Sequence, residues 1–318
     1  MEDPLPEQMR AAAGALLAAL DGPARARLAH PFGDDARRRL EYRPRPRAGI
    51  CLADLDRAGR KATHRLLATA LSPHAYAQAM AIMALEEVLD RAEGWRRGRH
   101  SDDYWVAVFG DPAHEDRWSW RVEGHHLSVS MTVVDDQVAA APIFLGANPA
   151  AVRYAGRTIS RPLAAEEDLA RALLEAMGVP ARAAAIVDDR APDDIISATR
   201  PTAPGRIDPL GVPASRLGPT ARALLGQLVA LYLDRLPPEL AAHEAHRLDG
   251  GDLHFAWAGP TRPGQRHYYR IQGDDLLIEY DDTTADGNHA HTVLRRPSAD
   301  FGADLLAAHH AEAHPRTG

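Results

Sequence analysis

Four side chains that can bind a metal or transfer a proton lie near the C-terminus, within the segment Leu276–Arg295. They are Glu279, Asp281, His289 and His291. Alternating apolar and polar residues predict a β-hairpin here, and alternate residues of a strand lie on one face of a sheet. We therefore expect all four side chains on one face. Imidazoles beside carboxylates suit either a metal site or acid–base chemistry.

The contacts within this hairpin depend on the length of its loop. If Thr283–Gly287 is a five-residue loop, Asp281 opposes His289 and Glu279 opposes His291. A slip by one residue would instead turn both carboxylates away from the histidines. We expect the first register. The alternative interpretation is a solvated polar face on an edge hairpin.

The preceding segment, His267–Gln272, is predicted to pair with Leu276–Asp282 across a short turn. With a three-residue turn Tyr269 lies opposite Glu279, and with a two-residue turn Arg270 does. A phenol or a guanidinium beside this carboxylate can donate hydrogen bonds to an anionic substrate. We therefore expect Glu279 to act as a general base, with Tyr269 or Arg270 orienting the substrate.

A second cluster lies within Trp118–Ser128, where Glu123 precedes a Gly-His-His sequence. Gly124 fits a β-bulge, which would redirect the side chains that follow it. Without a bulge, Glu123 and His125 share one face of the strand and His126 lies on the other. Either His125 or His126 is then a candidate third histidine ligand, with Glu123 as an alternative general base. The competing interpretation is a core histidine satisfied by hydrogen bonds.

The order of predicted elements indicates an α+β fold, with antiparallel sheet packed against a helical layer. Helices are predicted at 7–20, 52–72, 73–99, 165–177, 180–187, 218–247 and 304–313, and strands at 104–109, 117–123, 125–134, 138–145, 253–257, 267–272, 276–282 and 288–295. One domain over 1–318 would then contain a helical part (1–100), a β block (104–145), a helical middle (165–247) and a C-terminal strand meander with a closing helix (253–314). The Pro-rich stretch 191–219 is a loop, an active-site cover or a linker between domains. No internal repeat is evident.

The composition excludes several classes of protein. The 318 residues carry a formal net charge of −7, which argues against broad binding to nucleic acid. Lys61 is the only lysine and Cys51 the only cysteine, which disfavours a P-loop and excludes thiolate metal sites and intrachain disulfides. The chain has neither a long apolar run nor a basic, apolar leader, so we expect a cytoplasmic protein that does not contact the membrane.

Several linked segments resemble the bacterial and fungal family catalogued as domain of unknown function 3500. They are Ala79–Glu86, Trp120–Ser128, Phe144–Ala150, Glu166–Ala170, His254–Gly259, Tyr268–Gly273, Leu277–Asp281 and Asn288–His291. The resemblance runs over nearly the whole chain and implies a single-domain protein with the Gly-His-His and Asn-His-x-His elements at its centre. The chain differs from the usual family pattern at Asp282, Thr284, Leu294 and His310. The family name implies no activity.

These observations lead us to expect a metal-dependent enzyme that acts on a small molecule. His125, His126, His289, His291 and Asp281 are the candidate ligands, and Zn, Fe, Mn or Cu the candidate ions. Hydrolysis or elimination is favoured, because a bound ion can polarise an oxygen or activate water. The alternatives are a non-haem oxygenase or oxidase, a metal-free His/Glu isomerase or cyclase, and a non-enzymatic binding protein. The oligomeric state cannot be read from the sequence.

Overall fold

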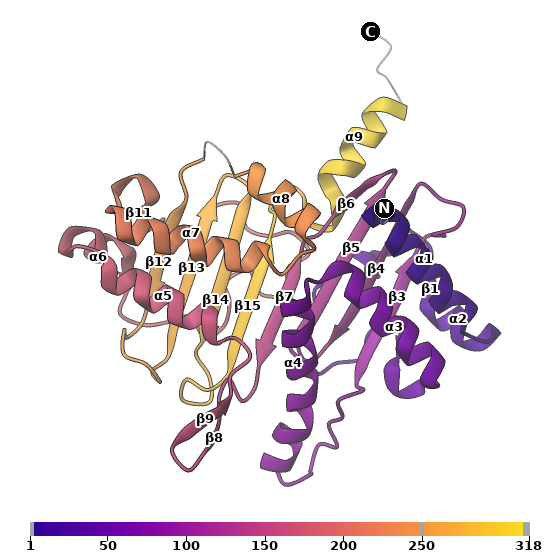
Figure 1. Ribbon diagram of the computed structural model, residues 1–318, viewed down its shortest axis with the longest axis horizontal. Helices are drawn as coiled ribbons and strands as arrows, with labels where there is room; N and C mark the ends of the chain where they lie inside the picture. The colour runs from indigo at the N-terminus through magenta and orange to yellow at the C-terminus, as the bar shows by residue number, and fades with distance from the viewer. Residues whose placement is uncertain (1–2, 249–250, 314–318) are drawn as a thin grey trace.

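The computed structural model describes residues 3–248 and 251–313, which form one continuous 13-stranded sheet with helices packed against it (Figure 1). The first half contains α1 (Leu5–Ala18), α2 (Gly22–Leu28), β1 (Ala29–His30), a 3-10 helix (Asp35–Arg38), β2 (Ile50–Cys51), a 3-10 helix (Leu52–Asp54), α3 (Arg57–Ala70), α4 (Pro73–Ala92), β3 (Tyr104–Phe109), β4 (Arg117–Gly124), β5 (Leu127–Val134), β6 (Gln137–Ala139) and β7 (Ile143–Ala147). Helices α3 and α4 each have a side-chain N-cap. Asp56 and Ser72 accept hydrogen bonds from backbone N–H groups in the first turns of these helices.

A separate two-stranded hairpin, β8 (Val152–Tyr154) and β9 (Arg157–Ser160), connects the two halves. The second half contains α5 (Ala164–Ala176), α6 (Val179–Ala185), β10 (Ile186–Asp188), β11 (Val212–Pro213), a 3-10 helix (Ala214–Arg216), α7 (Pro219–Leu233), α8 (Pro238–His246), β12 (His254–Ala258), β13 (His267–Gly273), β14 (Leu276–Asp282) and β15 (Ala290–Arg295). A last 3-10 helix (Asp300–Gly302) and α9 (Ala303–Ala313) follow.

The two halves repeat the same topology. The main strand order is β1-β3-β4-β5-β7-β15-β14-β13-β12-β10, which has the same pattern when read from either end. The outermost strands β1 and β10 each run parallel to the next strand, and β2 and β11 add antiparallel to β3 and β12. An approximate two-fold axis therefore passes between β7 and β15, at the seam where the halves meet (Figure 1).

The sequence retains traces of this repeat, so the expectation of no internal repeat is wrong. Arg117–Gly124 reads RWSWRVEG and Arg266–Gly273 reads RHYYRIQG, each followed by a two-residue turn, His125-His126 in one half and Asp274-Asp275 in the other. The two halves also share an unusual backbone conformation. Gly49 and Gly211, which occupy equivalent positions, have positive φ angles of 107° and 86°. At each glycine an added Cβ would lie 2.2 or 2.1 Å from a carbonyl oxygen of the adjoining strand, which explains why neither position carries a side chain.

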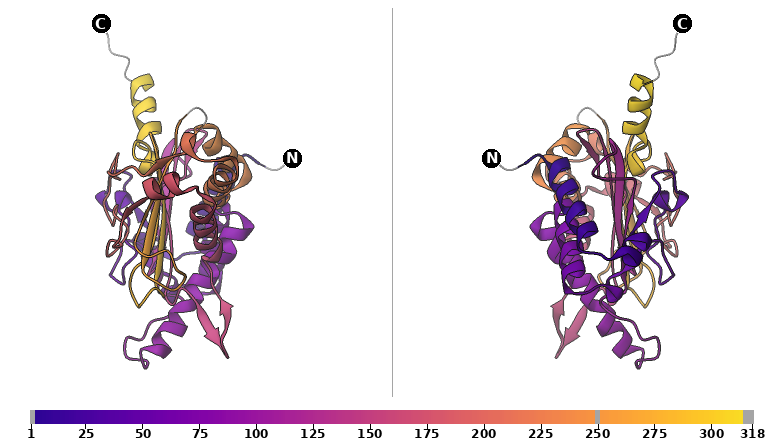
Figure 2. Two further views of the ribbon diagram at one scale, coloured as in Figure 1. Left: turned by 90° about the vertical axis from the view of Figure 1, so that its left-hand side faces the viewer. Right: turned by 90° about the vertical axis from the view of Figure 1, so that its right-hand side faces the viewer.

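The two faces of the sheet differ in character. Helices α1, α3, α4, α5, α7 and α8 lie on one face, over a core that includes Trp118, Trp120, Tyr269 and Tyr280, whereas α9 projects beyond the end of the sheet (Figures 1 and 2). The other face carries buried polar side chains and is covered by irregular chain. We call residues 31–49 the first cover segment and residues 189–211 the second cover segment. Their backbone groups satisfy the buried polar side chains beneath them, as such groups require.

The predicted α+β class and the closing helix are confirmed, with several local differences. The helix expected over 73–99 ends at Ala92, and residues 186–187 of the helix expected over 180–187 belong to β10. The helix expected over 218–247 is broken into α7 and α8 at Pro237-Pro238, since proline disrupts a helix interior. The strand expected over 138–145 is divided between β6 and β7, with Pro142 between them. His125 and His126, expected to begin a strand, form the turn before β5. No helix among the described residues is both long and apolar enough to cross a membrane.

Candidate functional site

Three histidine side chains meet at the seam between the two halves. His126 lies in the turn between β4 and β5. His289 immediately precedes β15, and His291 is the second residue of that strand. The Nε2 atoms of His126 and His289 are 2.8 Å apart. The ring centroids of His291 lie 5.3 Å from His126 and 4.7 Å from His289. One potential ligand atom from each residue lies within 4.8 Å of the others.

Close backbone packing directs His126 into this cluster. His126 has a φ of 63°, a left-handed conformation, and its N–H donates to the Tyr42 carbonyl of the first cover segment at 3.0 Å. Its carbonyl accepts from Gly146 of β7. A Cβ on Gly146 would lie 3.0 Å from the His126 ring and 3.1 Å from the His291 ring. Gly146 therefore makes room for two of the three imidazoles.

Two carboxylates contact the His291 ring at its Nδ1 atom and fix its orientation. Its Nδ1 lies 3.2 Å from Asp281 of β14 and 3.0 Å from Asp194 of the second cover segment. The Tyr42 hydroxyl donates to the other oxygen of Asp194 at 2.7 Å. Because Nδ1 is engaged, Nε2 is the nitrogen of His291 left to act as a ligand. Carboxylates commonly orient metal-binding histidines in this way.

His289 is held by the last residue of β14 and by the residue that follows β7. Its backbone N–H donates to Asp282 at 2.8 Å, and its Nδ1 lies 3.3 Å from the Asn148 side-chain amide. Asn288, one residue earlier, accepts from the N–H of Ala151 at 2.7 Å. Nδ1 of His289 is thus engaged, which leaves Nε2 turned toward His126.

The electrostatic environment favours neutral rings at two of the three histidines. Burial, together with the neighbouring His125 and His291, lowers the pKa of His126 well below its usual value. Burial and His291 also lower the pKa of His289 to about 3. At neutral pH both rings are therefore uncharged, which is the form that binds metal. Burial disfavours the charged form of His291 too, but Asp281 and Asp194 outweigh this and raise its pKa to about 10.

His125 points to a different set of partners. Its Nδ1 lies 2.5 Å from Glu86 of α4 and 3.3 Å from the Arg99 guanidinium, which itself lies 3.6 Å from Glu86. Glu86, His125 and His126 also form a group with metal-ligand spacing. However, Arg99 already supplies a positive charge to Glu86, and a cation placed there would be repelled by it. The geometry favours His126 over His125 as the ligand.

The predicted register of the C-terminal hairpin is wrong by two residues. Asp281 opposes His291 rather than His289, and Glu279 opposes Val293 rather than His291. The loop is longer than the predicted five residues, because the His289 N–H donates a hydrogen bond to the Asp282 side chain. The pairing of the two strands therefore starts at Ala290, which opposes Asp282. A shift of two residues preserves the face of the sheet. Asp281 and His291 therefore still meet, while Glu279 lies further along the strand.

The structure places Glu279 and Arg270 beneath the second cover segment. The turn between β13 and β14 has two residues, so Arg270 rather than Tyr269 opposes Glu279. The Glu279 carboxylate accepts from the N–H of Ile196 at 2.6 Å and from the Tyr268 hydroxyl at 2.9 Å. Arg270 donates to the carbonyls of Ile207 and Pro209 in the same segment. Burial raises the pKa of Glu279, although the hydrogen bonds it accepts oppose that change.

Glu123 and Tyr269 also lie away from the three histidines. The prediction that Glu123 and His125 share one face of a strand is wrong. Glu123 pairs with Ser128 on the polar face, where it accepts from the N–H of Glu41 at 2.9 Å, whereas His125 lies in the turn. Gly124 is regularly paired rather than bulged, and a Cβ there would lie 2.2 Å from the Tyr104 ring. Tyr269 is on the helix-covered face, where its hydroxyl donates to the Glu166 carbonyl at 3.0 Å.

Three contributors to the site were missed by sequence reasoning: Tyr42, Asn148 and Asp194. Asp194 lies in the Pro-rich stretch, for which a cover was one prediction, and Asn148 lies in a segment that resembles the family. Tyr42 stacks on Phe144 at 4.1 Å between ring centroids and lies 5.3 Å from the His291 ring. No local pattern distinguishes Tyr42 or Asp194, because each reaches the site only through long-range folding.

His267, the first residue of β13, opposes Asp282. Its ring lies between Trp257 and Tyr280 on the helix-covered face, with centroid distances of 4.9 and 5.4 Å. Burial, followed by the positive charge of Arg171, lowers the pKa of His267 to about 4. The folded protein thus favours the neutral ring.

This shift predicts a specific pH dependence of stability. A folded-state pKa below the unfolded value stabilises the protein above pH ~6.5, and that stabilisation is lost as the pH falls toward 4. The difference in unfolding free energy between wild type and His267→Gln is expected to be larger at pH 7 than at pH 4, by about 3 kcal/mol. Urea denaturation of both proteins at each pH measures it. A pH-independent difference would contradict the assignment.

Comparison with known proteins identifies the family but not a function. Residues 3–303 match the family model described as protein of unknown function (DUF3500), so the chain belongs to that family. No curated protein and no solved structure matches the chain.

Proposed function

We propose that this member of the family is a metal-dependent enzyme in which His126, His289 and His291 bind one divalent transition metal ion. The observation that carries the proposal is the meeting of these three imidazoles, with potential ligand atoms within 4.8 Å of one another. In a tetrahedral zinc site, nitrogens about 2.0–2.1 Å from the ion lie about 3.3 Å apart. Small side-chain movements would bring the three rings to that spacing.

The electrostatics of the cluster support the same conclusion. Without a cation, two neutral rings and an imidazolium share a buried site, and the Nε2 atoms of His126 and His289 approach to 2.8 Å. A bound ion would displace the proton of His291, leaving Asp281 and Asp194 to orient that ring and balance the ion's charge. Three imidazole ligands favour Zn, Fe or Cu over Mn, which prefers oxygen ligands.

A site with three protein ligands leaves a coordination position for water or substrate. The ion would lower the pKa of bound water or polarise a substrate oxygen, so we favour hydrolysis or elimination of a small molecule. Asp194 is the best placed proton acceptor, because its side chain is 39% exposed whereas that of Asp281 is 1% exposed. Glu279 and Glu123 are satisfied by backbone N–H groups and are better suited to holding the cover segments.

A second candidate function, metal-free acid–base catalysis, is favoured by the Asp281–His291 pair. An imidazole held at Nδ1 by a carboxylate presents Nε2 for proton transfer, as in many isomerases and cyclases. The two candidates differ in whether activity survives removal of metal. They share the same residues, so substitution of His291 alone would not separate them.

Metal analysis of the untagged, purified chain tests the proposal. We expect about one equivalent of Zn, Fe or Cu per chain, or its uptake when the metals are added back. Any turnover found in a metabolite screen should be lost on chelation and restored by the same metal. Less than about half an equivalent, with no gain on adding metals back, would overturn the metal proposal. Turnover that persists in the chelated protein would favour the metal-free candidate.

A further inference from the structure

Two parts of the chain project beyond the end of the sheet that carries the histidine cluster (Figures 1 and 2). The first projection, residues 88–100, is the end of α4 with the loop that follows it, and the second projection, residues 152–160, is the β8–β9 hairpin. Arg99 of the first projection lies 3.3 Å from His125, and the residue before the second projection donates its N–H to Asn288 at 2.7 Å. Both projections are therefore anchored beside the cluster.

The two projections carry most of the large apolar side chains that the protein exposes. Five such side chains are strongly exposed in the described part of the chain, and four of them are Val88, Trp95, Tyr154 and Ile159. Trp95 is 62% exposed and Tyr154 is 75% exposed. Single exposed apolar residues are common on protein surfaces, but a concentration of them marks an interaction site.

The backbone of each projection holds these side chains outward. Trp95 has a φ of 59°, which a bulky residue rarely adopts, and its N–H donates to the Asp90 carbonyl at 2.8 Å. In the second projection every residue from Arg153 to Ile159 is exposed. A two-stranded hairpin with both faces in water is only marginally stable. Both features indicate that the projections contact a partner.

The same projections are positively charged. Residues 88–100 contain four arginines and two acidic residues, and residues 152–160 contain two arginines and no acidic residue. Together they have a formal net charge of +4, whereas the whole chain has −7. Among the described residues, Arg91, Arg153 and Arg157 are exposed and have no ion-pair partner. The partner is therefore expected to be anionic.

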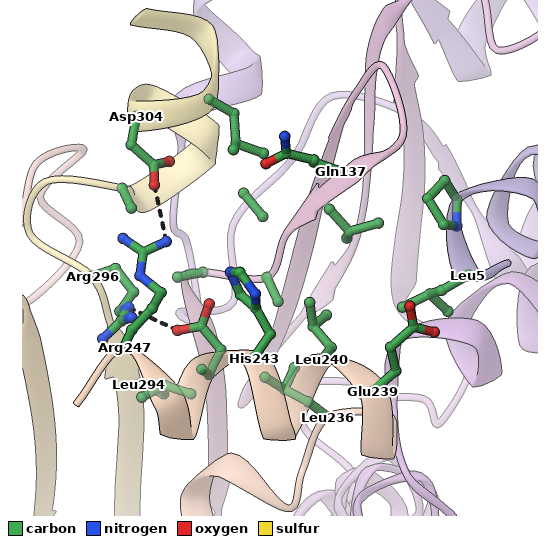
Figure 3. A pocket seen from close by; sticks show the side chains of 18 of the residues that line it. Leu5, Gln137, Leu236, Glu239, Leu240, His243, Arg247, Leu294, Arg296 and Asp304 are labelled. Carbon is green, nitrogen blue, oxygen red and sulfur yellow. Dashed lines mark hydrogen bonds and ion pairs between the residues drawn. The ribbon is translucent and has the colours of Figure 1, made fainter. Parts of the chain in front are cut away.

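The opposite end of the sheet has the reverse charge. A cavity of about 200 Å³ lies there, between α8 and the start of α9 (Figure 3). Apart from a histidine, its ionisable lining residues are four acids and two arginines, Asp136, Glu239, Glu244, Asp304, Arg247 and Arg296. Both arginines are paired, Arg247 with Asp304 at 3.0 Å and Arg296 with Glu244 at 2.8 Å. An anionic surface would therefore attract the end with the projections and repel the other.

We propose that the two projections bind a membrane surface that carries anionic lipids. The arginines would pair with lipid phosphates, while Trp95 and Tyr154 would lie among the headgroups, where such rings are enriched. Val88 and Ile159 would contact the acyl chains. A second copy of this chain fits less well, because two copies meeting at this end would bring their arginines together. A soluble polyanion would leave the apolar side chains in water.

This proposal differs from the expectation of no membrane contact, which rested on the lack of a long apolar run and of a basic, apolar leader. Peripheral binding requires neither, since interfacial side chains and basic residues suffice. It does not depend on the proposed metal site. It would, however, place the histidine cluster close to the lipid surface.

Sedimentation of the full chain with lipid vesicles tests the proposal. Vesicles with about 30% phosphatidylglycerol in phosphatidylcholine are expected to bind at least about tenfold more tightly than phosphatidylcholine alone. Binding should weaken when salt is raised from about 0.1 to about 1 M, because the charges are then screened. Absence of binding to the anionic vesicles, or equal binding to both kinds, would overturn the proposal.

A Trp95→Asn variant tests whether apolar contact contributes. Asparagine tolerates the left-handed backbone, and vesicle affinity is expected to fall at least about tenfold. The emission of the exposed Trp95 should shift to shorter wavelength on vesicles, and the variant should lack this shift. Val179→Ser is the matched control, because Val179 is 84% exposed on α6, outside both projections. Undiminished binding by the Trp95 variant would show that charge alone suffices, which favours a soluble polyanion and overturns the membrane proposal.

An Arg153→Gln/Arg157→Gln variant locates the binding on the hairpin. Vesicle affinity is expected to fall at least about tenfold, because two cations leave the surface. Arg57→Gln/Arg65→Gln removes the same charge from exposed positions of α3 and should bind as wild type does. Equal losses in the two double variants, each with a native circular-dichroism spectrum, would show that only net charge matters and would overturn the assignment to the projections.

Discussion

A His126→Asn variant is expected to purify with only background levels of transition metal. His126 is the one ligand contributed by the first half of the chain, and asparagine is too short to reach the position of its Nε2. Asparagine also tolerates the left-handed backbone at this position, where φ is 63°, so the turn should be retained. The variant should lose the stabilisation that bound metal gives wild type, about 2.7 kcal/mol at a metal concentration of 100 times Kd.

His125→Asn is the matched control for this experiment, because it changes the neighbouring residue of the same turn. His125 contacts Glu86 and Arg99 rather than His289, so this variant should keep its metal. Elemental analysis and thermal denaturation, with and without chelator, measure both effects. If the His125 variant loses metal and the His126 variant keeps it, the ligands must instead include Glu86 and His125.

An Arg235→Met variant is expected to lose about 3–5 kcal/mol of unfolding free energy, because it leaves a buried carboxylate without its partner. Arg235 donates to Glu166 at 2.8 Å, and both side chains are 0% exposed. The pair lies on the helix-covered side, where Gln78 of the first half also bonds Glu166. It therefore contributes to holding the two halves together.

Urea denaturation measures this loss, with Arg27→Met as the control. Arg27 pairs with Asp54 at the surface, where an ion pair contributes about 0–1 kcal/mol. A double variant, Glu166→Gln/Arg235→Met, should recover part of the stability, since no uncompensated charge remains. A loss at Arg235 no larger than that at Arg27 would show that Glu166 takes up a proton or reaches water when its partner is removed.

Local patterns in the sequence predicted much of the fold. Strands such as Tyr104–Phe109 and Leu276–Asp282 have the predicted bounds, because alternation and turn residues are short-range signals. The face of Asp281 and His291 was also predictable, since it depends only on the period of a strand. The partner of each residue was not, because a hydrogen bond that the His289 N–H donates to the Asp282 side chain lengthens the loop.

The rest of the site depends on contacts between residues distant in sequence. Asp194 lies 97 positions from His291 along the chain, and no local pattern marks it as a partner. His126 lies in a two-residue turn, whereas the sequence predicts that a strand begins at His125. The position of its side chain could therefore not be predicted. The internal repeat was missed because the clearest shared motif is short, and the two copies differ at the turn that follows this motif.

The seam between β7 and β15 lies on the approximate two-fold axis, which has an evolutionary consequence. Two identical chains related by such an axis would form a homodimer in which every residue at the seam occurs twice. A tandem gene duplication removes that constraint. The turn at His125-His126 can then carry imidazoles while its counterpart at Asp274-Asp275 carries carboxylates. Fusion of two copies would in this way allow different side chains at two equivalent positions of one chain.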